Sequence, residues 1–251
     1  MKDHSLLQLA VISLARTPCR WDAFKKRLGN QPWPLERVWG VDAELISDND
    51  LNHLLTRRRL SASALAWPKG QVGCALSHQL CWRKCIASGM PMLVFEDDAL
   101  LAKNWHVHLE QSFNELPIED WDLLLLGWNQ DSCLQVEWAK GLSASYFFHP
   151  RYPSQQHLQV ALNEPSIARG WSRVIRSFGL AGYVVSVNGA KRLLSWSVPL
   201  RTLEITNPVM RPGTCFSLDG QLNGLYPEIN AWVLSPPLIV GANEKMSSLT
   251  T

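Results

Sequence analysis

Short apolar segments alternate along the chain with longer segments in which apolar residues recur at helical spacing. The short segments have the length and the β-branched content of buried strands. They cover residues 8–14, 35–39, 92–95, 122–126, 183–186 and 231–234. Helices are expected between them, over residues 17–28, 48–59, 70–86 and 190–196. Strands that alternate with helices are typical of an α/β fold with a largely parallel sheet.

No linker divides the sequence, so we predict a single domain over residues 1–251. This length exceeds the usual ~100–200 residues of a domain but lies within reach of one α/β domain. Residues 143–172 lack clear periodicity and hold three prolines. We predict an irregular insertion there, and long loops of this kind in compact domains are often functional.

The first apolar segment, residues 6–15, resembles the core of a signal peptide in composition. No small-x-small cleavage site follows it, and Arg16 and Arg20 come directly after it. Ten residues are also too few to cross a bilayer. The six cysteines are too sparse for a disulfide scaffold in a chain of this length. We therefore expect a cytoplasmic protein with reduced thiols and at most peripheral contact with the inner membrane face.

The charge is nearly balanced, with a formal net charge of +2. A nucleic-acid-binding protein would usually carry a dominant basic face, so nucleic acid is not expected as a partner. The only basic run is Arg57-Arg58-Arg59. We interpret it as a solvated helix end, and the alternative is a contact with an anionic acceptor or a membrane surface.

Three consecutive acids, Glu96, Asp97 and Asp98, follow the apolar segment 92–95. Like charges repel and their desolvation is costly, so such a cluster favours a place where a cation or solvent offsets the charge. Alternate residues of an extended chain face the same side, which predicts that Glu96 and Asp98 share a Mn²⁺ or Mg²⁺ ion. Asp97 would then point elsewhere. The alternative is an acidic helix N-terminus.

The segment Gly73-Cys74-Ala75-Leu76-Ser77-His78 lies shortly before the acid cluster. Ser77 and His78 offer hydrogen-bonding groups, and we predict that they belong to a donor-binding site. A buried structural histidine is the alternative. Cys74, His78, Cys81 and Cys85 share one helical face, but four ligands on one straight helix cannot close a tetrahedron around zinc.

Four stretches of the sequence together resemble glycosyltransferase family 25, the family of the lipooligosaccharide galactosyltransferases. They are an opening strand with two arginines, a Gly-Cys-x-x-Ser-His helix, a strand that ends in Glu-Asp-Asp, and a later strand with its helix. In this chain they are residues 11–16 with Arg20, residues 70–78 with Trp82, residues 93–98, and residues 182–186 with Gly189, Ala190, Leu193 and Leu194. Ser13 and Ala15 depart from the asparagine and aspartate common in the opening motif, which weakens any prediction of ribose or base contacts there.

The resemblance implies a GT-A type fold, in which helices flank a Rossmann-like central sheet. It also implies a UDP-sugar donor, usually UDP-galactose, a divalent ion, Mn²⁺ or Mg²⁺, and inversion at the anomeric carbon. A hexose would move to a saccharide or a lipid-linked glycan acceptor. Metal ions and a general base suit this chemistry because a hydroxyl must lose its proton while a diphosphate leaves.

Individual roles follow from this expectation. Asp98 is predicted as the principal metal ligand, with Glu96 beside it or in contact with the donor, and Asp97 as a donor-binding residue. Arg16 and Arg20 are expected near the diphosphate, since a planar guanidinium suits phosphate oxygens. Salt bridges on a helix face are the alternative for both arginines.

Asp219, in the segment Ser217-Leu218-Asp219-Gly220, is our prediction for the general base. A helix-capping role or a place beside the metal ligands is the alternative. Among the twelve tryptophans, Trp128, Trp138 and Trp171 lie near the predicted insertion and are candidates for acceptor contacts, unless they pack in the core.

Two other classes of function stay open on the sequence alone. One is a sugar- or nucleotide-binding protein of the same fold that does not turn over. The other is a metal-dependent phosphohydrolase, since clustered acids serve that chemistry as well. Donor hydrolysis in the presence of Mn²⁺ would argue against the first, and phosphate release without sugar transfer would support the second.

Overall fold

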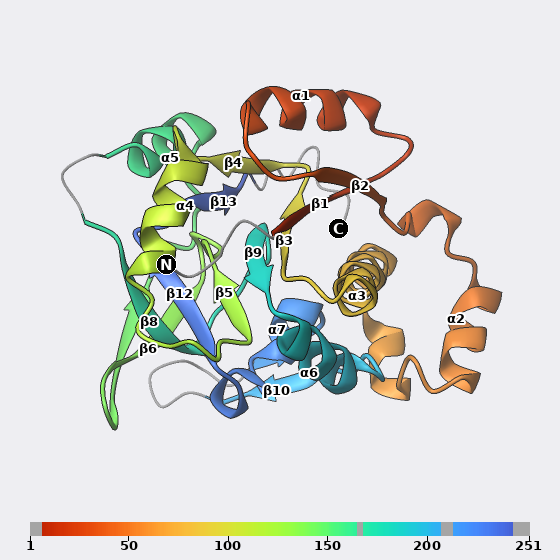
Figure 1. Cartoon of the computed structure of the whole chain (residues 1–251). Coiled ribbons are helices and arrows are strands. Elements are labelled where there is room, and N and C mark those ends of the chain that lie inside the picture. The colour runs from red at the N-terminus through yellow and green to blue at the C-terminus, as the bar shows by residue number, and fades with distance from the viewer. Residues whose placement is uncertain (1–6, 165–167, 207–212, 243–251) are drawn as a thin grey trace.

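A nine-stranded sheet forms the centre of the computed structural model, which describes residues 7–164, 168–206 and 213–242. The strand order is β2-β1-β3-β9-β5-β12-β8-β6-β7, and helices cover both faces (Figure 1). The α/β class is therefore confirmed. The strands of this sheet are β1 (Gln8–Ser13), β2 (Leu35–Trp39), β3 (Met92–Glu96), β5 (Leu123–Leu125), β6 (Cys133–Ala139), β7 (Leu142–Phe147), β8 (Gly170–Arg176), β9 (Gly182–Val185) and β12 (Ala231–Ser235).

Two small antiparallel pairs accompany the sheet. They are β4 (Ala99–Leu101) with β13 (Ile239–Gly241), and β10 (Leu203–Ile205) with β11 (Gly213–Cys215). The helices are α1 (Pro18–Leu28), α2 (Asp48–Thr56), α3 (Lys69–Ser88), α4 (Trp105–Asn114), α5 (Gln155–Leu162), α6 (Val187–Ser197) and α7 (Leu218–Leu222), with three 3₁₀ turns, η1 (Ala43–Leu45), η2 (Ala62–Ala66) and η3 (Tyr226–Glu228). Each expected strand and helix is present within a few residues of its predicted bounds. None of the helices in the described ranges is both long and apolar enough to cross a membrane.

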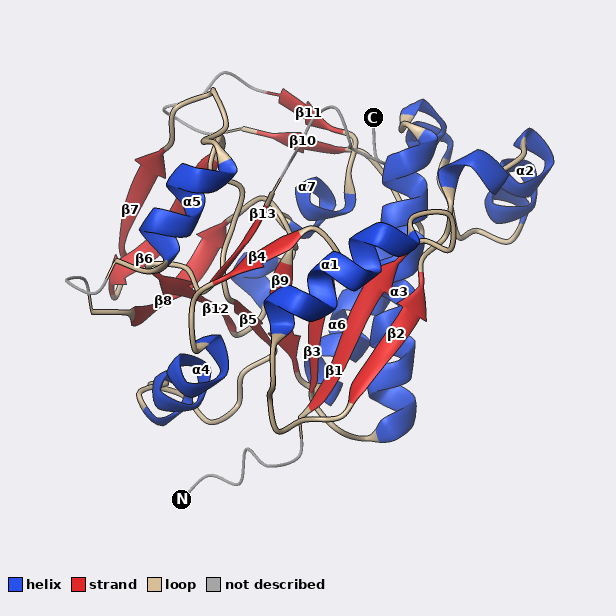
Figure 2. Cartoon of the chain, turned by 90° about the horizontal axis from the view of Figure 1, so that it is seen from above, coloured by secondary structure: helices blue, strands red, loops and turns tan. Residues whose placement is uncertain are grey.

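The sheet is mixed, which corrects the expectation of a largely parallel one. Strands β2, β1 and β3 run parallel, and Figure 2 shows the arrowheads of β1 and β2 at the same end. Strands β5 and β12 are also parallel to each other. However, β9 lies between β3 and β5 and runs against both, and β8, β6 and β7 continue from β12 as antiparallel neighbours. The two-residue turn between β6 and β7 can join only antiparallel strands.

The predicted irregular insertion at 143–172 is also corrected. Its described part contains most of β7, the whole of α5 and the start of β8, while residues 165–167 lie outside the described residues. The Ser154 hydroxyl accepts a hydrogen bond from the His157 amide and so begins α5. Leu158 and Leu162, four residues apart, then bury the same helix face.

Two hydrophobic cores lie on opposite faces of the sheet. Neighbouring residues of a strand point to opposite faces, so Val94 belongs to one core and Leu93 and Phe95 to the other. Helices α3, α6 and α7 cover the face of Val94, and α1, α4 and α5 cover the other (Figure 1). Both faces of the central strands are thus closed, and the ends of the strands are the places left for a site.

Candidate active site

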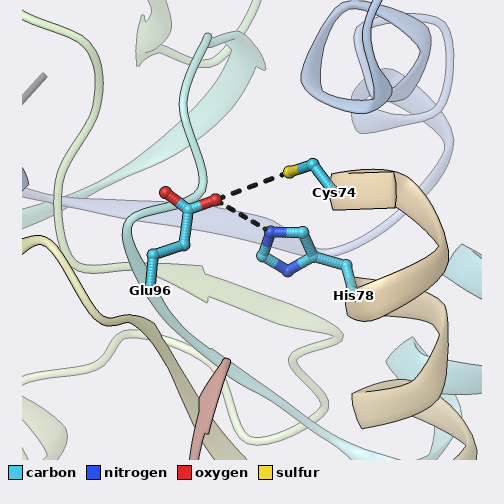
Figure 3. A group of neighbouring side chains, drawn as sticks. All are labelled: Cys74, His78 and Glu96. Carbon is cyan, nitrogen blue, oxygen red and sulfur yellow. Dashed lines mark hydrogen bonds and ion pairs between the residues drawn. The ribbon is translucent and has the colours of Figure 1, made fainter. Parts of the chain in front are cut away.

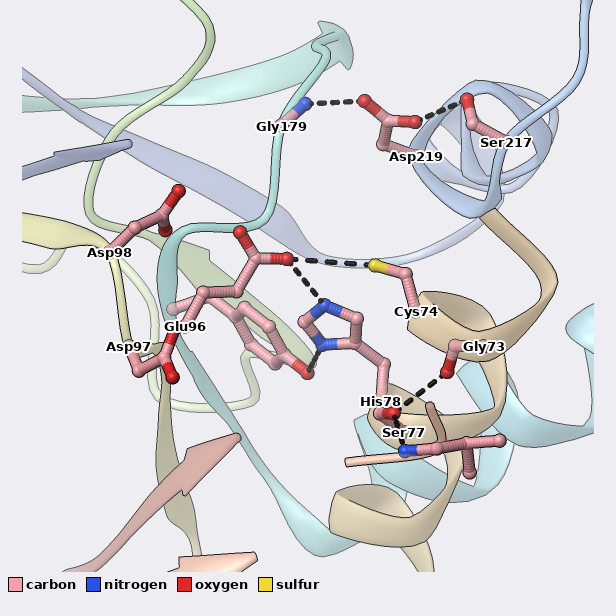
Figure 4. A network of polar contacts seen from close by, with 12 residues as sticks. Gly73, Cys74, Ser77, His78, Glu96, Asp97, Asp98, Gly179, Ser217 and Asp219 are labelled. Carbon is pink, nitrogen blue, oxygen red and sulfur yellow. Dashed lines mark hydrogen bonds and ion pairs between the residues drawn. The ribbon is translucent and has the colours of Figure 1, made fainter. Parts of the chain in front are cut away.

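A cavity of about 380 Å³ lies at the carboxyl ends of β1 and β3. This volume falls within the ~300–1,000 Å³ of typical small-molecule sites. Of the predicted site residues, all except Arg16 line the cavity. They are Arg20, Ser77, His78, Glu96, Asp97, Asp98 and Asp219. Figure 4 shows most of these side chains, with hydrogen bonds that they make to one another and to neighbouring residues.

Glu96 ends β3, and one of its oxygens faces α3. The His78 Nε2 lies 3.2 Å from Oε1, and the Cys74 thiol donates to the same oxygen over 3.6 Å (Figure 3). Burial alone would raise the pKa of Glu96, but its interactions with His78, the hydrogen bond from Cys74 and the charge of Arg20 outweigh the effect of burial. The pKa of Glu96 therefore lies below its ordinary value, and the residue is a carboxylate at neutral pH.

Asp98 is the least compensated acid of the cluster. Its Oδ2 lies 3.6 Å from the Arg20 guanidinium. Its Oδ1 is buried and makes no hydrogen bond within the described residues. Burial and the nearby Glu96 carboxylate raise the pKa of Asp98 to about 7, although Arg20 opposes the rise. A buried carboxylate oxygen without a partner is costly, so this atom is suited to a cation.

Asp97 points away from this pair, as the alternation along β3 predicted. Its Oδ1 lies 2.6 Å from the Arg20 guanidinium, and the side chain is buried. Burial raises the pKa of Asp97, and the charge of Arg20 opposes that rise. Arg27 of α1 donates to the backbone carbonyls of Asp97 and Ala99 over 2.7 and 3.0 Å. Two arginines of α1 thus hold the acid turn from the side chain and from the backbone.

Ser77 joins α3 to the loop after β2. Its hydroxyl donates to the Gly73 carbonyl over 2.7 Å and accepts from the Val41 amide over 2.8 Å. A Cβ at Gly73 would lie 2.5 Å from the Val41 carbonyl oxygen, so only glycine permits this approach. Ser77 lines the cavity, but its hydroxyl is already engaged in these two hydrogen bonds, which connect α3 to the loop. The predicted role in donor binding stays a prediction.

Asp219 lies in the first turn of α7 and faces the loop before β9. Its Oδ2 accepts a hydrogen bond from the Gly179 amide over 2.8 Å, and its Oδ1 accepts from the Ser217 hydroxyl and the Gly220 amide. Ser217, rather than Asp219, is the N-cap residue of this helix. Asp219 is therefore fixed in the cavity wall. Its Oδ1 already accepts two hydrogen bonds, so Oδ2 is the oxygen that retains a lone pair for a ligand.

Arg16 does not join the other predicted residues. Its guanidinium pairs with Asp42 at 2.7 Å and Glu44 at 3.2 Å, so the alternative of a salt bridge applies, although Arg16 precedes α1 and lies on no helix face. Arg20 lies inside the helix, one turn further on, and reaches the acids instead. The basic run 57–59 follows the end of α2, with Arg57 and Arg58 exposed, which agrees with a solvated helix end.

None of the three candidate acceptor tryptophans lines the cavity. Trp128 is buried and packs against Phe148, with ring centroids 5.6 Å apart. Trp171 donates its indole N–H to the Ser112 carbonyl over 2.7 Å. Trp138 lies near the turn between β6 and β7 and is 72% exposed. Core packing holds Trp128 and a structural hydrogen bond holds Trp171, which agrees with the interpretation that these rings are part of the packed interior.

The four possible zinc ligands on α3 do not come together. The Cys85 thiol donates to the carbonyls of Met90 and Val185, and Cys81 is buried in the core. Within the described ranges, the metal-compatible group of mixed type is Cys74, His78 and Glu96, whose ligand atoms lie within 4.8 Å of one another. All six cysteines are free, as expected for reduced thiols. The cavity thus offers two possible sets of metal ligands that share Glu96. One adds the sulfur and nitrogen atoms of Cys74 and His78, and the other adds the carboxylate oxygens of Asp98.

Three further residues of the site did not emerge from the sequence. Tyr183, from β9, lies 3.0 Å from His78 Nδ1. Asn129 and Gly179 line the cavity opposite α3. A signal for Asn129 existed, because it follows the predicted strand 122–126 at the edge where ligands bind. Gly179 has a φ of +92°, a conformation that favours glycine. No local pattern pointed to Tyr183, which is 105 residues from His78 in sequence.

A sheet with helices on both faces and an acidic, ligand-sized cavity at its strand ends is typical of α/β proteins that bind small ligands. Comparison with family models identifies the chain more closely. The model described as glycosyltransferase family 25 (LPS biosynthesis protein) matches residues 7–207. The chain therefore belongs to glycosyltransferase family 25, and the resemblance of its four motifs is confirmed.

Relatives within the family carry different names. The chain is 30% identical over 207 residues to the "Probable inactive glycosyltransferase 25 family member 3" of Bos taurus, which covers 78% of this chain and 30% of that protein. It is 27% identical over 131 residues to the "Lipooligosaccharide biosynthesis protein lex-1" of Haemophilus influenzae, covering 51% and 37% respectively. It is 28% identical over 131 residues to "Procollagen galactosyltransferase 1" of Danio rerio, covering 50% and 17%. The matched region thus spans about a third or less of these relatives' own length.

Proposed function

We propose that this chain is an inverting glycosyltransferase that moves a hexose, galactose in the first instance, from a UDP-sugar to a saccharide or lipid-linked glycan acceptor. The observation that carries the proposal is the Asp98 carboxylate, which has an unpartnered buried oxygen and faces the cavity beside ionised Glu96. This arrangement is unfavourable unless a cation offsets it. The names of the bacterial and zebrafish relatives support a sugar substrate.

The residues of the acid cluster fit a divalent cation. Asp98 Oδ1 and the Glu96 oxygen that His78 does not contact would hold it, and hard carboxylate oxygens suit Mn²⁺ or Mg²⁺. When bound, the ion supplies charge neutralisation for a departing diphosphate. Arg20, which lines the cavity beside both aspartates, would add a fixed positive charge near the phosphates.

Asp219 is the base in this proposal. The acceptor hydroxyl oxygen forms a bond to the anomeric carbon of the donor sugar on the face opposite the diphosphate. The bond between that carbon and the diphosphate oxygen breaks, and its electron pair leaves with UDP. The hydroxyl proton passes to Asp219, whose Oδ2 accepts only one hydrogen bond among the described residues, from the Gly179 amide. Inversion follows from this single displacement.

A second candidate function is donor binding without transfer. It is favoured by the names of the mammalian relatives, which describe inactive members of the family. In that case the cavity would bind a UDP-sugar, but no acceptor would be glycosylated. The intact cluster of Glu96, Asp98 and Asp219 in one cavity supports the transferase over this alternative.

A donor screen tests both candidates. We expect UDP-galactose with Mn²⁺ to raise the melting temperature, because a ligand that binds only the folded state stabilises it by mass action. Mn²⁺ alone should give a smaller rise, and UDP-galactose with a chelator a smaller one still. UDP-glucose and UDP-N-acetylglucosamine serve as matched donors that test the choice of sugar. The absence of any shift with every UDP-sugar would refute the proposal.

Transfer itself is measured as the release of UDP when saccharide acceptors are added. Release that depends on both Mn²⁺ and an acceptor supports the transferase. Binding without any release of UDP, or release only as slow hydrolysis, would support the inactive alternative. Release of inorganic phosphate from nucleotides would instead indicate a phosphohydrolase.

Metal binding should depend on pH through Asp98. The pKa of this group is about 7 in the metal-free protein, and a cation competes with the proton for the carboxylate. The protonated fraction therefore rises as the pH falls, and we expect Mn²⁺ affinity to drop about tenfold from about pH 8 to about pH 6. Isothermal titration at several pH values checks this. An affinity that stays constant over that range would contradict the raised pKa.

A further inference from the structure

A chain of three hydrogen bonds leads from the hydrophobic core to the carboxylate of Glu96. The Trp82 indole N–H donates to the Tyr183 hydroxyl oxygen over 2.9 Å. That oxygen lies 3.0 Å from His78 Nδ1, and His78 Nε2 lies 3.2 Å from Glu96 Oε1. The side chains of Trp82, Tyr183 and His78 are fully buried. Bulk water therefore does not reach the contacts of the Tyr183 hydroxyl with Trp82 and His78, and these polar atoms depend on their protein partners.

The indole fixes the direction of the chain because its N–H can only donate. The Tyr183 oxygen accepts from Trp82, so its own hydroxyl hydrogen needs an acceptor. Nδ1 of His78 is the acceptor in contact with that hydroxyl among the described residues. It can accept only when it carries no proton, and the proton of the neutral ring then lies on Nε2. His78 therefore donates to Glu96.

The other tautomer is unfavourable at both ends of the ring. A proton on Nδ1 would leave the buried Tyr183 hydroxyl hydrogen without an acceptor. It would also set the lone pair of Nε2 against those of Glu96 Oε1, 3.2 Å away. A doubly protonated ring would likewise leave the Tyr183 hydroxyl hydrogen without an acceptor. Tyr183, held by Trp82, thus selects the donor form of His78.

We propose that Tyr183 is a positioning residue that acts through His78 to aim the Glu96 carboxylate. The His78 N–H and the Cys74 thiol converge on Oε1 (Figure 3). Oε2 is left as the oxygen that can turn to a cation or a donor. This inference rests on the proposed function for the identity of that ligand, but the hydrogen-bond chain itself does not depend on it.

The test compares two phenylalanine variants of buried tyrosines. Tyr183→Phe keeps the ring and removes the hydroxyl that contacts His78. Tyr226→Phe is the matched control, because Tyr226 is equally buried and its hydroxyl has no hydrogen-bond partner in the described part of the chain. Melting temperatures establish that both variants fold. Nitrogen-15 NMR of the imidazoles then reports which nitrogen of His78 carries the proton, with His78→Gln identifying the signal.

In the wild type and in Tyr226→Phe, we expect His78 to carry a proton on Nε2 and none on Nδ1. In Tyr183→Phe, only Glu96 still favours the proton on Nε2, so we expect a weaker preference, with more of the ring protonated on Nδ1 than in Tyr226→Phe. Mutation of a residue that orients a metal ligand typically lowers metal affinity about 10–100-fold. Mn²⁺ affinity measured by calorimetry should therefore fall about tenfold in Tyr183→Phe and stay unchanged in Tyr226→Phe.

Two results would overturn the inference. One is a wild-type His78 with the proton on Nδ1, a result that decides the matter even if Tyr183→Phe does not fold. The other is a Tyr183→Phe variant that matches Tyr226→Phe in both tautomer and Mn²⁺ affinity. A third result separates the two proposals. If the wild type shows the expected tautomer and Tyr183→Phe weakens it, but the wild type binds no Mn²⁺, the hydrogen-bond chain is supported and the proposed function is overturned.

Discussion

Asp98→Asn should reduce sugar transfer by about a thousandfold or more, because electrostatic stabilisation of a leaving group contributes strongly to catalysis. The amide keeps the shape of the side chain but cannot offer an anionic oxygen to a cation. Mn²⁺ affinity, measured by titration, should fall with the activity. Asp120→Asn is a suitable control, since Asp120 is an exposed acid outside the cavity.

The same substitution should leave the metal-free protein as stable as the wild type, or more stable. The folded state raises the pKa of Asp98 from 3.8 to about 7, so between these values the folded protein binds more protons than the unfolded chain. Stability contributed by this group therefore falls as the pH rises through that range. Asparagine does not titrate, and its advantage in melting temperature should grow from about pH 4 to about pH 7. A large loss of stability in Asp98→Asn would point to a structural role and against the metal site.

Asp219→Asn should lower kcat by about a hundred- to ten-thousandfold, the range usual for removal of a general base. The affinity for the UDP-sugar should change far less, because in our proposal Asp219 contacts the acceptor hydroxyl. Part of the local structure is retained, since the amide oxygen can keep either the hydrogen bond from Gly179 or the two from Ser217 and Gly220. Steady-state kinetics separate the two parameters.

Ser217→Ala gives the contrast needed to interpret that result. It removes the N-cap of α7 and one hydrogen bond to Asp219, but it leaves the carboxylate in place. Loss of the cap should cost about 1 kcal/mol of stability, with most of the transfer activity retained. If Ser217→Ala lost as much activity as Asp219→Asn, the function of Asp219 would be to hold the wall of the cavity, and the base would have to be sought elsewhere.

Much of the site could be predicted from local pattern, because strand ends and helix starts are local features. The apolar run before Glu96 marked a buried strand, and the rule that ligands bind at strand ends led to the acid cluster. The separation of Arg16 from Arg20 could not be predicted in this way. Both follow β1, and only the start of α1 at Pro18 and the presence of Asp42 decide which one reaches the acids.

Other features depend on contacts that sequence pattern does not carry. An apolar run such as residues 182–185 looks the same whichever way the strand runs, so the antiparallel place of β9 was not predictable. The same strand brings Tyr183 to His78. The helical spacing that grouped Cys81 and Cys85 with Cys74 ignored the wide burial of α3, which carries buried residues on several sides.

Strand β12 pairs with β5 on one side and with β8 on the other. The strands that precede it in sequence therefore form two blocks until residues 231–235 have been synthesised. During translation, the block that carries Glu96 and the block of β6, β7 and β8 cannot be joined until β12 has left the ribosome. The edges of β5 and β8 stay unpaired until then, and unpaired edges are where a nascent chain is most prone to pair with other chains.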